Sequence, residues 1–311
     1  MGGLAVAALL AAVAVGSAHS ARALTRASWP RRSPAAAILL WQALGLAGGL
    51  AAIGALLAIG VDGEQTQSAG AFGGLGRLAS GQLLAPHQSA LVATLRLAML
   101  AAGFALLSVL SWMLVIAFTD AIAARRRQRE LLALLARGDP KAPGALVVDY
   151  PAAAAYCLPG IRSQIVVSAG TLELLAPAEL AAVLAHERAH LRARHDLVLI
   201  PFTSLRRTFP RSGVIRQAYR TVALLVEMMA DDRALRVRGL FARELATALL
   251  RFGTAGAQCP AGALSAAEGE LTARVNRLLA PPPPLSRAAQ AAVVLSAAAL
   301  VVTPLLLLAI A

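Results

Sequence analysis

Long apolar runs alternate with short charged segments along the chain. Four runs approach or exceed the length of about 20 apolar residues that a membrane span requires. They cover about residues 4–18, 35–61, 97–118 and 291–311, and the first is the shortest but carries no charge. This pattern predicts a mainly α-helical membrane protein with four transmembrane helices.

The stretch between the third and fourth runs has a different pattern. It has the length and the polar content of a domain with its own core. Short apolar runs bounded by proline and glycine predict strands in it, and longer periodic runs predict helices. The expected elements are a basic helix at 122–136, strands at 145–150, 154–158 and 163–168, and helices at 177–194 and 215–237. Strands followed by helices indicate an α+β domain inserted between the spans.

A run of four prolines, Pro281 to Pro284, marks the end of this domain and is expected to form a stiff spacer. We therefore divide the chain into three transmembrane helices in residues 1–119, an inserted domain in 120–286 and a fourth transmembrane helix in 287–311. Within the second span, Gly45 and Gly49 have the small-xxx-small spacing at which helices pack closely.

The composition agrees with a membrane protein, because 58% of the residues are hydrophobic and 14% are charged. The formal net charge is +13, and all but one of the 29 basic residues are arginine, the exception being Lys141. Basic residues beside apolar spans usually serve topology or lipid headgroups. The charge therefore indicates the lipid bilayer as partner, and no direct contact with nucleic acid is expected.

Arginine clusters predict the orientation of the chain in the plasma membrane. They are Arg22, Arg26, Arg31 and Arg32 after the first run, and Arg125 to Arg127 with Arg129 after the third. Positive loops face the cytoplasm, whereas the sparsely charged loop at 62–88 fits the outside. The inserted domain is then cytoplasmic, both chain termini lie outside, and Cys157 and Cys259 are expected to be reduced thiols.

The segment "AVLAHERAHLRARHD", residues 182–196, carries the chemistry. His186 and His190 are four residues apart, so they lie about 40° from each other on one helix face, where two imidazoles can bind one tetrahedral zinc. Glu187 is rotated by about 100° from His186, which places it beside the metal as a general base. This spacing predicts a zinc hydrolase, in which Glu187 is the catalytic acid and base.

A catalytic zinc usually has a third protein ligand. His195 lies about 140° around the helix from His190, so it could ligate only if the helix breaks before it. Glu227 and Asp231 share one face of an apolar helix in "VEMMADDRAL", where an unpaired carboxylate is costly to bury. One of them could complete the zinc site while the other orients a ligating histidine through its free ring N–H.

The alternative for this acidic pair is purely structural. In that interpretation, Glu227 and Asp231 form salt bridges with arginines such as Arg220 or Arg233. Asp232 points elsewhere on the helix and is expected to be solvated.

These residues resemble a known family. The segment "AYCLPGIRSQIVVSAGTLELLAPAELAAVLAHERAHLRARHD", followed by "EMMADDRA", is similar to the membrane metallopeptidases of the BlaR/MecR type, which are antibiotic-sensing signal transducers. The resemblance implies a gluzincin-like zincin domain between the third and fourth spans. It also implies that His186, His190 and Glu227 ligate zinc, that Glu187 is the catalytic acid and base, and that activity leads to cleavage of a BlaI/MecI-like winged-helix repressor in the cytoplasm.

The chain departs from this family in one respect. The antibiotic sensors carry an extracellular penicillin-binding domain after the fourth span, with an acylable serine in Ser-x-x-Lys. In the printed sequence, the only lysine, Lys141, has Gly138 three residues before it, so no such sensor is expected.

Residues 163–168 are expected to form an edge strand that binds the substrate backbone by strand addition.

Two other functions stay open. An HtpX-type quality-control protease also combines spans, His-Glu-x-x-His and a later glutamate, and would degrade damaged membrane proteins. A non-enzymatic membrane scaffold with a structural zinc or none is a third hypothesis, ranked last because the motif is intact.

Overall fold

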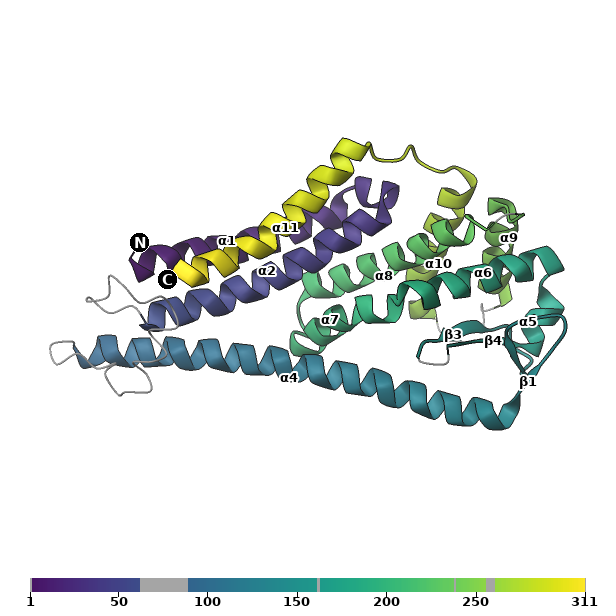
Figure 1. Cartoon of the computed structure of the whole chain (residues 1–311), viewed down its shortest axis with the longest axis horizontal. Coiled ribbons are helices and arrows are strands. Elements are labelled where there is room, and N and C mark those ends of the chain that lie inside the picture. Colours follow the sequence, from purple (N-terminus) through teal and green to yellow (C-terminus); the bar gives the residue numbers. More distant parts are fainter. Residues whose placement is uncertain (1, 62–88, 161–162, 238, 256–260, 311) are drawn as a thin grey trace. The chain divides into compact units, whose positions relative to one another are not determined.

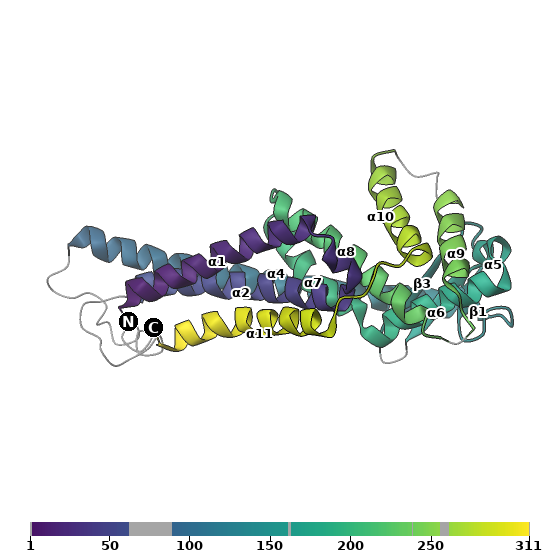
Figure 2. The same cartoon turned by 90° about the horizontal axis from the view of Figure 1, so that it is seen from above.

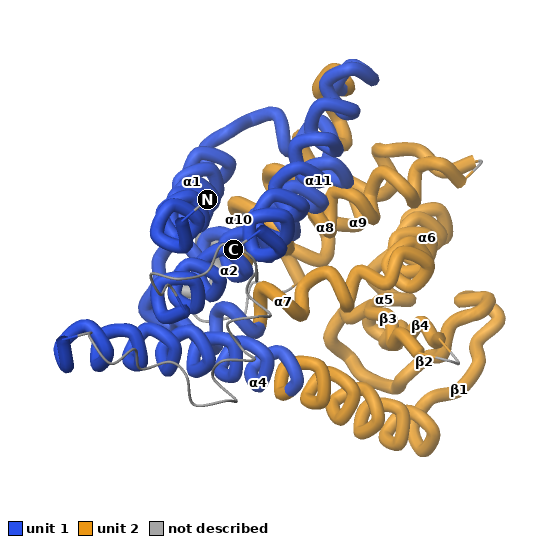
Figure 3. The backbone as a smooth tube through the Cα atoms, turned by 60° about the vertical axis from the view of Figure 1, so that its left-hand side comes forward, with its two compact units in different colours: residues 1–115, 204–218, 285–311 blue, residues 116–203, 219–284 orange. Residues whose placement is uncertain are grey.

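The computed structural model describes residues 2–61, 89–160, 163–237, 239–255 and 261–310. They form two compact units, shown in different colours in Figure 3. Unit 1 comprises residues 1–115, 204–218 and 285–311, and unit 2 comprises residues 116–203 and 219–284. The expected outer loop at 62–88 and Cys259 lie outside the described residues.

Among the residues that the structure describes, four helices are long and apolar enough to cross a membrane. They are α1 (Gly3–Arg26), α2 (Pro34–Val61), α4 (Ala90–Leu135) and α11 (Arg287–Ile310), with a short 3-10 helix, η1 (Trp29–Arg32), between the first two. The first helix is longer than predicted, because Arg22 and Arg26 lie on its last turns and not in a loop. In unit 1, α2 packs against both α1 and α11 (Figure 1).

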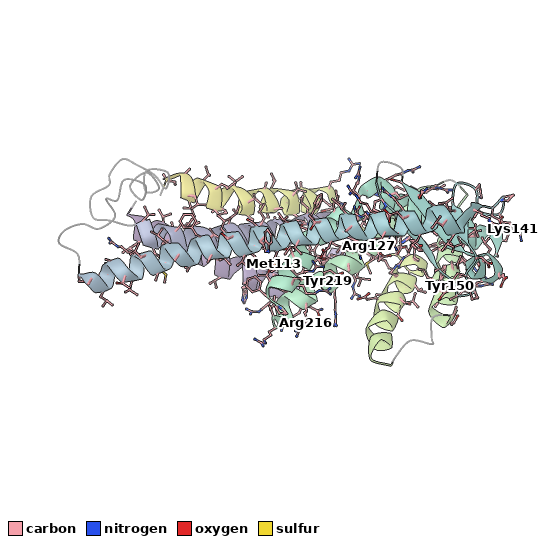
Figure 4. All side chains as sticks on the ribbon, turned by 90° about the horizontal axis from the view of Figure 1, so that it is seen from below. Met113, Arg127, Lys141, Tyr150, Arg216 and Tyr219 are labelled. Atoms are coloured by element: carbon pink, nitrogen blue, oxygen red, sulfur yellow. The ribbon has the colours of Figure 1, made fainter. Side chains whose placement is uncertain are left out.

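The third span and the basic helix expected at 122–136 are one continuous helix of 46 residues, α4. The junction around Phe118 to Ile122 contains no glycine or proline, so nothing in the local sequence ends the helix there. Figure 4 labels Met113 in the apolar part of α4 and Arg127 in its basic part. The predicted boundary between span and domain therefore falls inside a helix.

Glycines bring the unit 1 helices close together, but not the glycines that the spacing indicated. A Cβ added at Gly45 or Gly49 would meet no atom within 4 Å, so the predicted close packing at this pair is wrong. A Cβ at Gly54 would lie 2.8 Å from Leu308 Cδ2 and 3.2 Å from Leu10 Cδ1. Gly54 is thus the position where α2 approaches both α1 and α11.

Unit 2 contains a four-stranded sheet with the order β1-β2-β4-β3. Its strands are β1 (Ala136–Gly138), β2 (Leu146–Val148), β3 (Ala155–Leu158) and β4 (Gln164–Ser168). Strand β4 pairs in parallel with β2 and antiparallel with β3. The prediction that residues 163–168 form an edge strand is therefore wrong, and the edge on that side of the sheet is β3.

Burial explains why β4 is an inner strand. Ile165, Val166 and Val167 are each at most 3% exposed, which suits a strand that is covered on both faces. Ile165 and Val167 pack with Leu180 and Leu184 in one core cluster. The short strand β1, which the hydrophobic pattern did not predict, extends the sheet on the far side of β2.

The part of the chain that the structure describes contains six further helices after β4 and before α11. They are α5 (Ala169–Leu174), α6 (Pro177–Ala193), α7 (His195–Thr208), α8 (Gly213–Ala234), α9 (Ala242–Ala255) and α10 (Ala261–Leu279). Of these, α6 and α8 match the two predicted helices to within a few residues. Helix α9 packs on α6, and α10 packs on α9 (Figure 2).

The contact at Gly54 generates a prediction. Gly54→Leu should destabilise the packing of α1, α2 and α11 by about 1–3 kcal/mol, because extra methylene groups would be forced between Leu308 and Leu10. The matched control, Gly49→Leu, places the same side chain in open space. Thermal unfolding of the purified chain in detergent measures both, and an equal loss in the two variants would contradict the packing.

Candidate metal centre

Helix α6 delivers the two histidines, and its start is defined by local contacts. It begins at Pro177, as predicted, and the Oε2 atom of Glu179 accepts a hydrogen bond of 2.9 Å from the backbone N–H of Ala176. Arg251 Nη1 on α9 lies 3.4 Å from the same carboxylate oxygen. These contacts fix the first turn, so the buried face of α6 carries His186 into the interior of unit 2.

Three side chains from α6 and α8 converge. Glu227 Oε2 lies 3.3 Å from His186 Nε2, and Glu227 Oε1 lies 3.5 Å from His190 Nε2. The two Nε2 atoms are 3.0 Å apart, and all ligand atoms of the trio lie within 4.8 Å of one another. The His186 side chain is 8% exposed and that of Glu227 is 38% exposed. The cluster can therefore hold a metal ion that enters from the solvent side of Glu227.

Asp231 lies behind His186. Its Oδ1 atom is 2.9 Å from His186 Nδ1, and its side chain is 1% exposed. A carboxylate at Nδ1 holds the ring N–H on that side, which leaves Nε2 free to face His190 and Glu227. This position agrees with the orienting contact expected for one of the two carboxylates, and its role towards a metal stays a prediction.

Arg274 on α10 is a residue of this centre that the sequence did not indicate. Its Nε and Nη2 atoms donate to Asp231 Oδ2 and Oδ1 at 2.9 and 2.7 Å, and its Nη1 atom lies 3.0 Å from Glu227 Oε2. The salt-bridge partner of the two carboxylates is therefore Arg274 and not Arg220 or Arg233. Glu227 and Asp231 also face His186, so their salt bridges to Arg274 and their contacts with the histidine are present together.

Next to it on α10, Arg277 forms a second two-pronged pair. Its Nη1 and Nη2 atoms donate to Asp232 Oδ1 and Oδ2 at 2.6 and 2.8 Å. The expectation that Asp232 is simply solvated is wrong, although its side chain is 36% exposed. Two arginine–aspartate pairs thus hold α10 against the end of α8.

His195 reaches the centre because α6 breaks before it. Arg194 adopts a left-handed conformation with φ 51° and ends the helix, and α7 starts at His195. The turn places His195 Nδ1 3.0 Å from His190 Nδ1, on the ring side opposite to Glu227. Arg233 Nη1 lies 3.1 Å from His195 Nε2. His195 therefore supports His190 and does not join the ligand cluster.

The charges in the centre shift its pKa values. Burial alone would raise the pKa of Glu227 and Asp231, but hydrogen bonds from His186 and the Arg274 guanidinium hold both pKa values below the usual range. Burial opposes a charged His186, yet hydrogen bonds to Asp231 and Glu227 outweigh it and raise its pKa to about 9. In the centre without metal, the negative charges of Glu227 and Asp231 are thus balanced by the protonated His186 ring and by Arg274.

Glu187 follows His186 on α6, and its side chain faces strand β3, where Cys157 lies. Burial raises its pKa, while the positive charges of His186 and His190 oppose this shift. The thiol of Cys157 on β3 hydrogen-bonds to Glu187, and burial together with the Glu187 charge raises the pKa of this thiol to about 12. Glu187 is therefore a half-buried carboxylate beside the metal cluster, and Cys157 is held as a neutral thiol.

The two arginines of α10 generate a stability prediction for the metal-free chain. Arg274→Gln removes one of the two cations that meet the buried Asp231, the other being His186, and should cost up to about 3 kcal/mol, whereas Arg277→Gln breaks a more exposed pair worth about 1 kcal/mol or less. Added zinc should stabilise both variants, because both keep the three ligands, but it should narrow the difference between them, since the metal supplies positive charge to Glu227, which loses Arg274 in the first variant only. Thermal melts in detergent with and without zinc measure both; equal losses would contradict this prediction.

The raised pKa of His186 generates a second prediction. Because this ring is protonated below pH 9 in the metal-free chain, metal binding at neutral pH must displace a proton, and apparent affinity should rise with pH up to about 9. Calorimetric zinc titrations in buffers of different ionisation enthalpy count the protons released. Asp231→Asn removes the main hydrogen bond that raises this pKa and should release fewer protons at pH 8. Unchanged release in this variant would refute the assignment.

Comparison with known families agrees with this geometry. Residues 121–255, which include His186, His190 and Glu227, match Peptidase family M48. No curated protein and no solved structure matches the chain. Peptidases of this family depend on a metal, so the match and the three converging side chains together indicate a metallopeptidase domain in a chain with four candidate membrane helices.

Proposed function

We propose that this chain is an integral-membrane zinc endopeptidase whose centre is formed by His186, His190, Glu187 and Glu227. The observation that carries the proposal is the convergence of three ligand atoms within 4.8 Å in a segment that matches a peptidase family. A non-enzymatic scaffold would have no use for Glu187 beside that cluster. Both histidines direct their Nε2 atoms towards the Glu227 carboxylate.

The donor set suits zinc. Two imidazole nitrogens and one carboxylate are a common ligand set of catalytic zinc, and they leave a position open. Asp231 and His195 lie on the far ring nitrogens of His186 and His190, where such contacts orient metal-binding imidazoles. When bound, the metal would polarise the scissile carbonyl and make water easier to deprotonate.

Glu187 is the proposed acid and base. Its carboxylate neighbours the cluster without being part of it, and burial raises its pKa towards the range in which a carboxylate exchanges protons efficiently. It can take a proton from the attacking water and pass it to the leaving amine. The neutral Cys157 thiol donates a hydrogen bond to the same group and so restricts its position.

The substrate is proposed to be a protein segment in extended conformation. Strand β3, and not β4, is the sheet edge on the α6 side, and it packs on α6. Cys157 on β3 contacts Glu187, so an additional strand along this edge would pass close to the carboxylate.

We further propose a cytoplasmic location for unit 2 and an outer location for both chain termini. The support is the arginine pattern, since the basic residues after the first and third spans favour the cytoplasmic side. The natural substrate would then be a cytoplasmic protein near the plasma membrane.

Two substrate classes follow from the resemblances. The similarity to BlaR/MecR-type peptidases favours regulatory cleavage of a winged-helix repressor of the BlaI/MecI type. The alternative is removal of damaged membrane proteins, as in HtpX-type proteases. The family match supports the peptidase class and does not distinguish these two roles.

Glu187→Gln tests the proposal. This variant should keep zinc bound, because the cluster of His186, His190 and Glu227 is intact, but it should cleave about 10²–10⁴-fold more slowly through loss of the base. Zinc content by mass spectrometry and cleavage of a casein-type substrate are the two measurements. Glu173→Gln, an exposed glutamate on α5, is the matched control. Cleavage at the wild-type rate by Glu187→Gln would exclude the enzymatic role.

The same variant separates the two substrate classes. New protein termini are compared between cells that carry the native chain and cells that carry Glu187→Gln. A single new terminus in one transcriptional regulator supports the repressor role. Termini spread over many membrane proteins support quality control.

A further inference from the structure

A cavity rich in arginine lies on another face of α6. Its volume is about 930 Å³, within the range of about 300–1,000 Å³ that small-molecule sites occupy. It is formed by α6, the end of α8 and the turn that follows α8. The lining residues are Ala181, Ala185, Arg188, Ala189, Arg192, Arg233, Arg236, Val237, Gly239 and Leu240.

This cavity is distinct from the metal cluster. Its α6 residues recur at the spacing of one helix face, and neither His186 nor His190 lines it. The cavity and the cluster therefore use different faces of the same helix, and an occupant of the cavity would not occupy the metal centre.

The charge of the cavity is unbalanced. Of the ten lining residues that the structure describes, four are arginine and none is acidic. Among the described residues, no carboxylate forms an ion pair with any of these four guanidinium groups, in contrast to Arg274 and Arg277. Like charges around one volume repel each other, so an anion that enters it gains Coulomb energy from all four.

Two of the arginines are already oriented. Arg188 Nη2 donates to the carbonyl oxygen of Pro143 at 2.9 Å, and Arg233 Nη1 lies 3.1 Å from His195 Nε2. Each guanidinium has five N–H donors, so both retain donors for a ligand. Arg192 and Arg236 are exposed and are free to close on it.

The remaining lining is apolar. Ala181, Ala185 and Ala189 lie along one face of α6, and Val237 and Leu240 contribute from the turn after α8. Guanidinium groups match the geometry of phosphate oxygens through paired N–H donors. A ligand that combines a phosphate with an uncharged organic part fits this mixed lining of arginine and apolar side chains.

We propose that this cavity binds an organic phosphate, with the phosphate held by Arg188, Arg192, Arg233 and Arg236 and the organic part on the alanines of α6. The ligand chemistry is a phosphate ester, from either a soluble nucleotide or a phospholipid headgroup. Binding would also reach the metal centre, because Arg233 contacts His195 and His195 contacts His190. This coupling rests on the proposed peptidase function, whereas the binding does not.

The binding test uses ADP as probe and the full chain in an uncharged detergent. Calorimetry should give saturable binding that weakens as salt is added. Arg192→Ala combined with Arg236→Ala should reduce the affinity at least about tenfold, since two charge-assisted contacts are lost. Both arginines are exposed, so the variant should fold normally.

The control removes the same charge elsewhere in unit 2. Arg137→Ala combined with Arg243→Ala changes two exposed arginines on β1 and α9 that do not line the cavity. Equal ADP affinity in the two double variants, or no saturable binding at all, would overturn the proposal. If ADP were bound only by a metal ion, the two double variants would have equal ADP affinity. Binding of polyglutamate but not of ADP would also overturn it, in favour of an acidic protein partner.

The source of the phosphate is distinguished in nanodiscs. If the occupant is a lipid headgroup, discs that contain phosphatidic acid should block ADP binding, whereas pure phosphatidylcholine discs should not. If the occupant is a soluble nucleotide, ADP should bind equally in both. Either result supports a phosphate-ester site and assigns its source.

The coupling has its own readout. Saturating ADP should change the kcat/KM of peptide cleavage at least about twofold in the native chain and should leave the kcat/KM of Arg192→Ala/Arg236→Ala unchanged, each protein being compared with itself without ADP. A chain that binds ADP without any change in kcat/KM would refute the coupling and leave the site in place. A chain that binds ADP but cleaves nothing would contradict the proposed function and not the cavity.

Discussion

Two carboxylates one turn apart on α8, Asp231 buried and Glu227 partly exposed, are the constraint on which the centre depends. Glu227 and Asp231 could not both be ionised in the interior unless positive charge met them from neighbouring elements. His186 supplies it from α6, and Arg274 supplies it from α10. Side chains from three helices therefore meet at this point, and their opposite charges stabilise one another. A metal ion would add further positive charge beside Glu227, the more exposed of the two carboxylates.

This constraint also explains the shape of the supporting structure. The helix break at Arg194 costs the strain of a left-handed residue, yet it turns His195 back to support His190. The buried strand β4 packs against the apolar face of α6 and so supports the helix that carries these contacts. Glu187 projects from the same helix towards β3, so the proposed base and the edge strand are placed by one element.

Local spacing made part of this predictable. The four-residue interval of His186 and His190, and the Glu227–Asp231 face on an apolar helix, depend only on helical geometry, and the structure brings these side chains together. Arg274 was not predictable, because it lies 43 residues from Asp231 and is one of many arginines with no distinguishing pattern. The place of β4 inside the sheet depends on its parallel pairing with β2, a long-range choice that hydrophobic alternation does not encode.

The abundance of arginine invites the view that each one is only a consequence of composition. The partners of these side chains argue otherwise for unit 2. Arg274 and Arg277 each meet an aspartate with two hydrogen bonds, so charge on α10 is matched where it is buried. The cavity beside α6 gathers four guanidinium groups, Arg188 and Arg233 among them, with no acid in its lining. A fold that neutralises arginine at one site and leaves it unneutralised around an open cavity at another provides positive charge there for an anion from outside the chain.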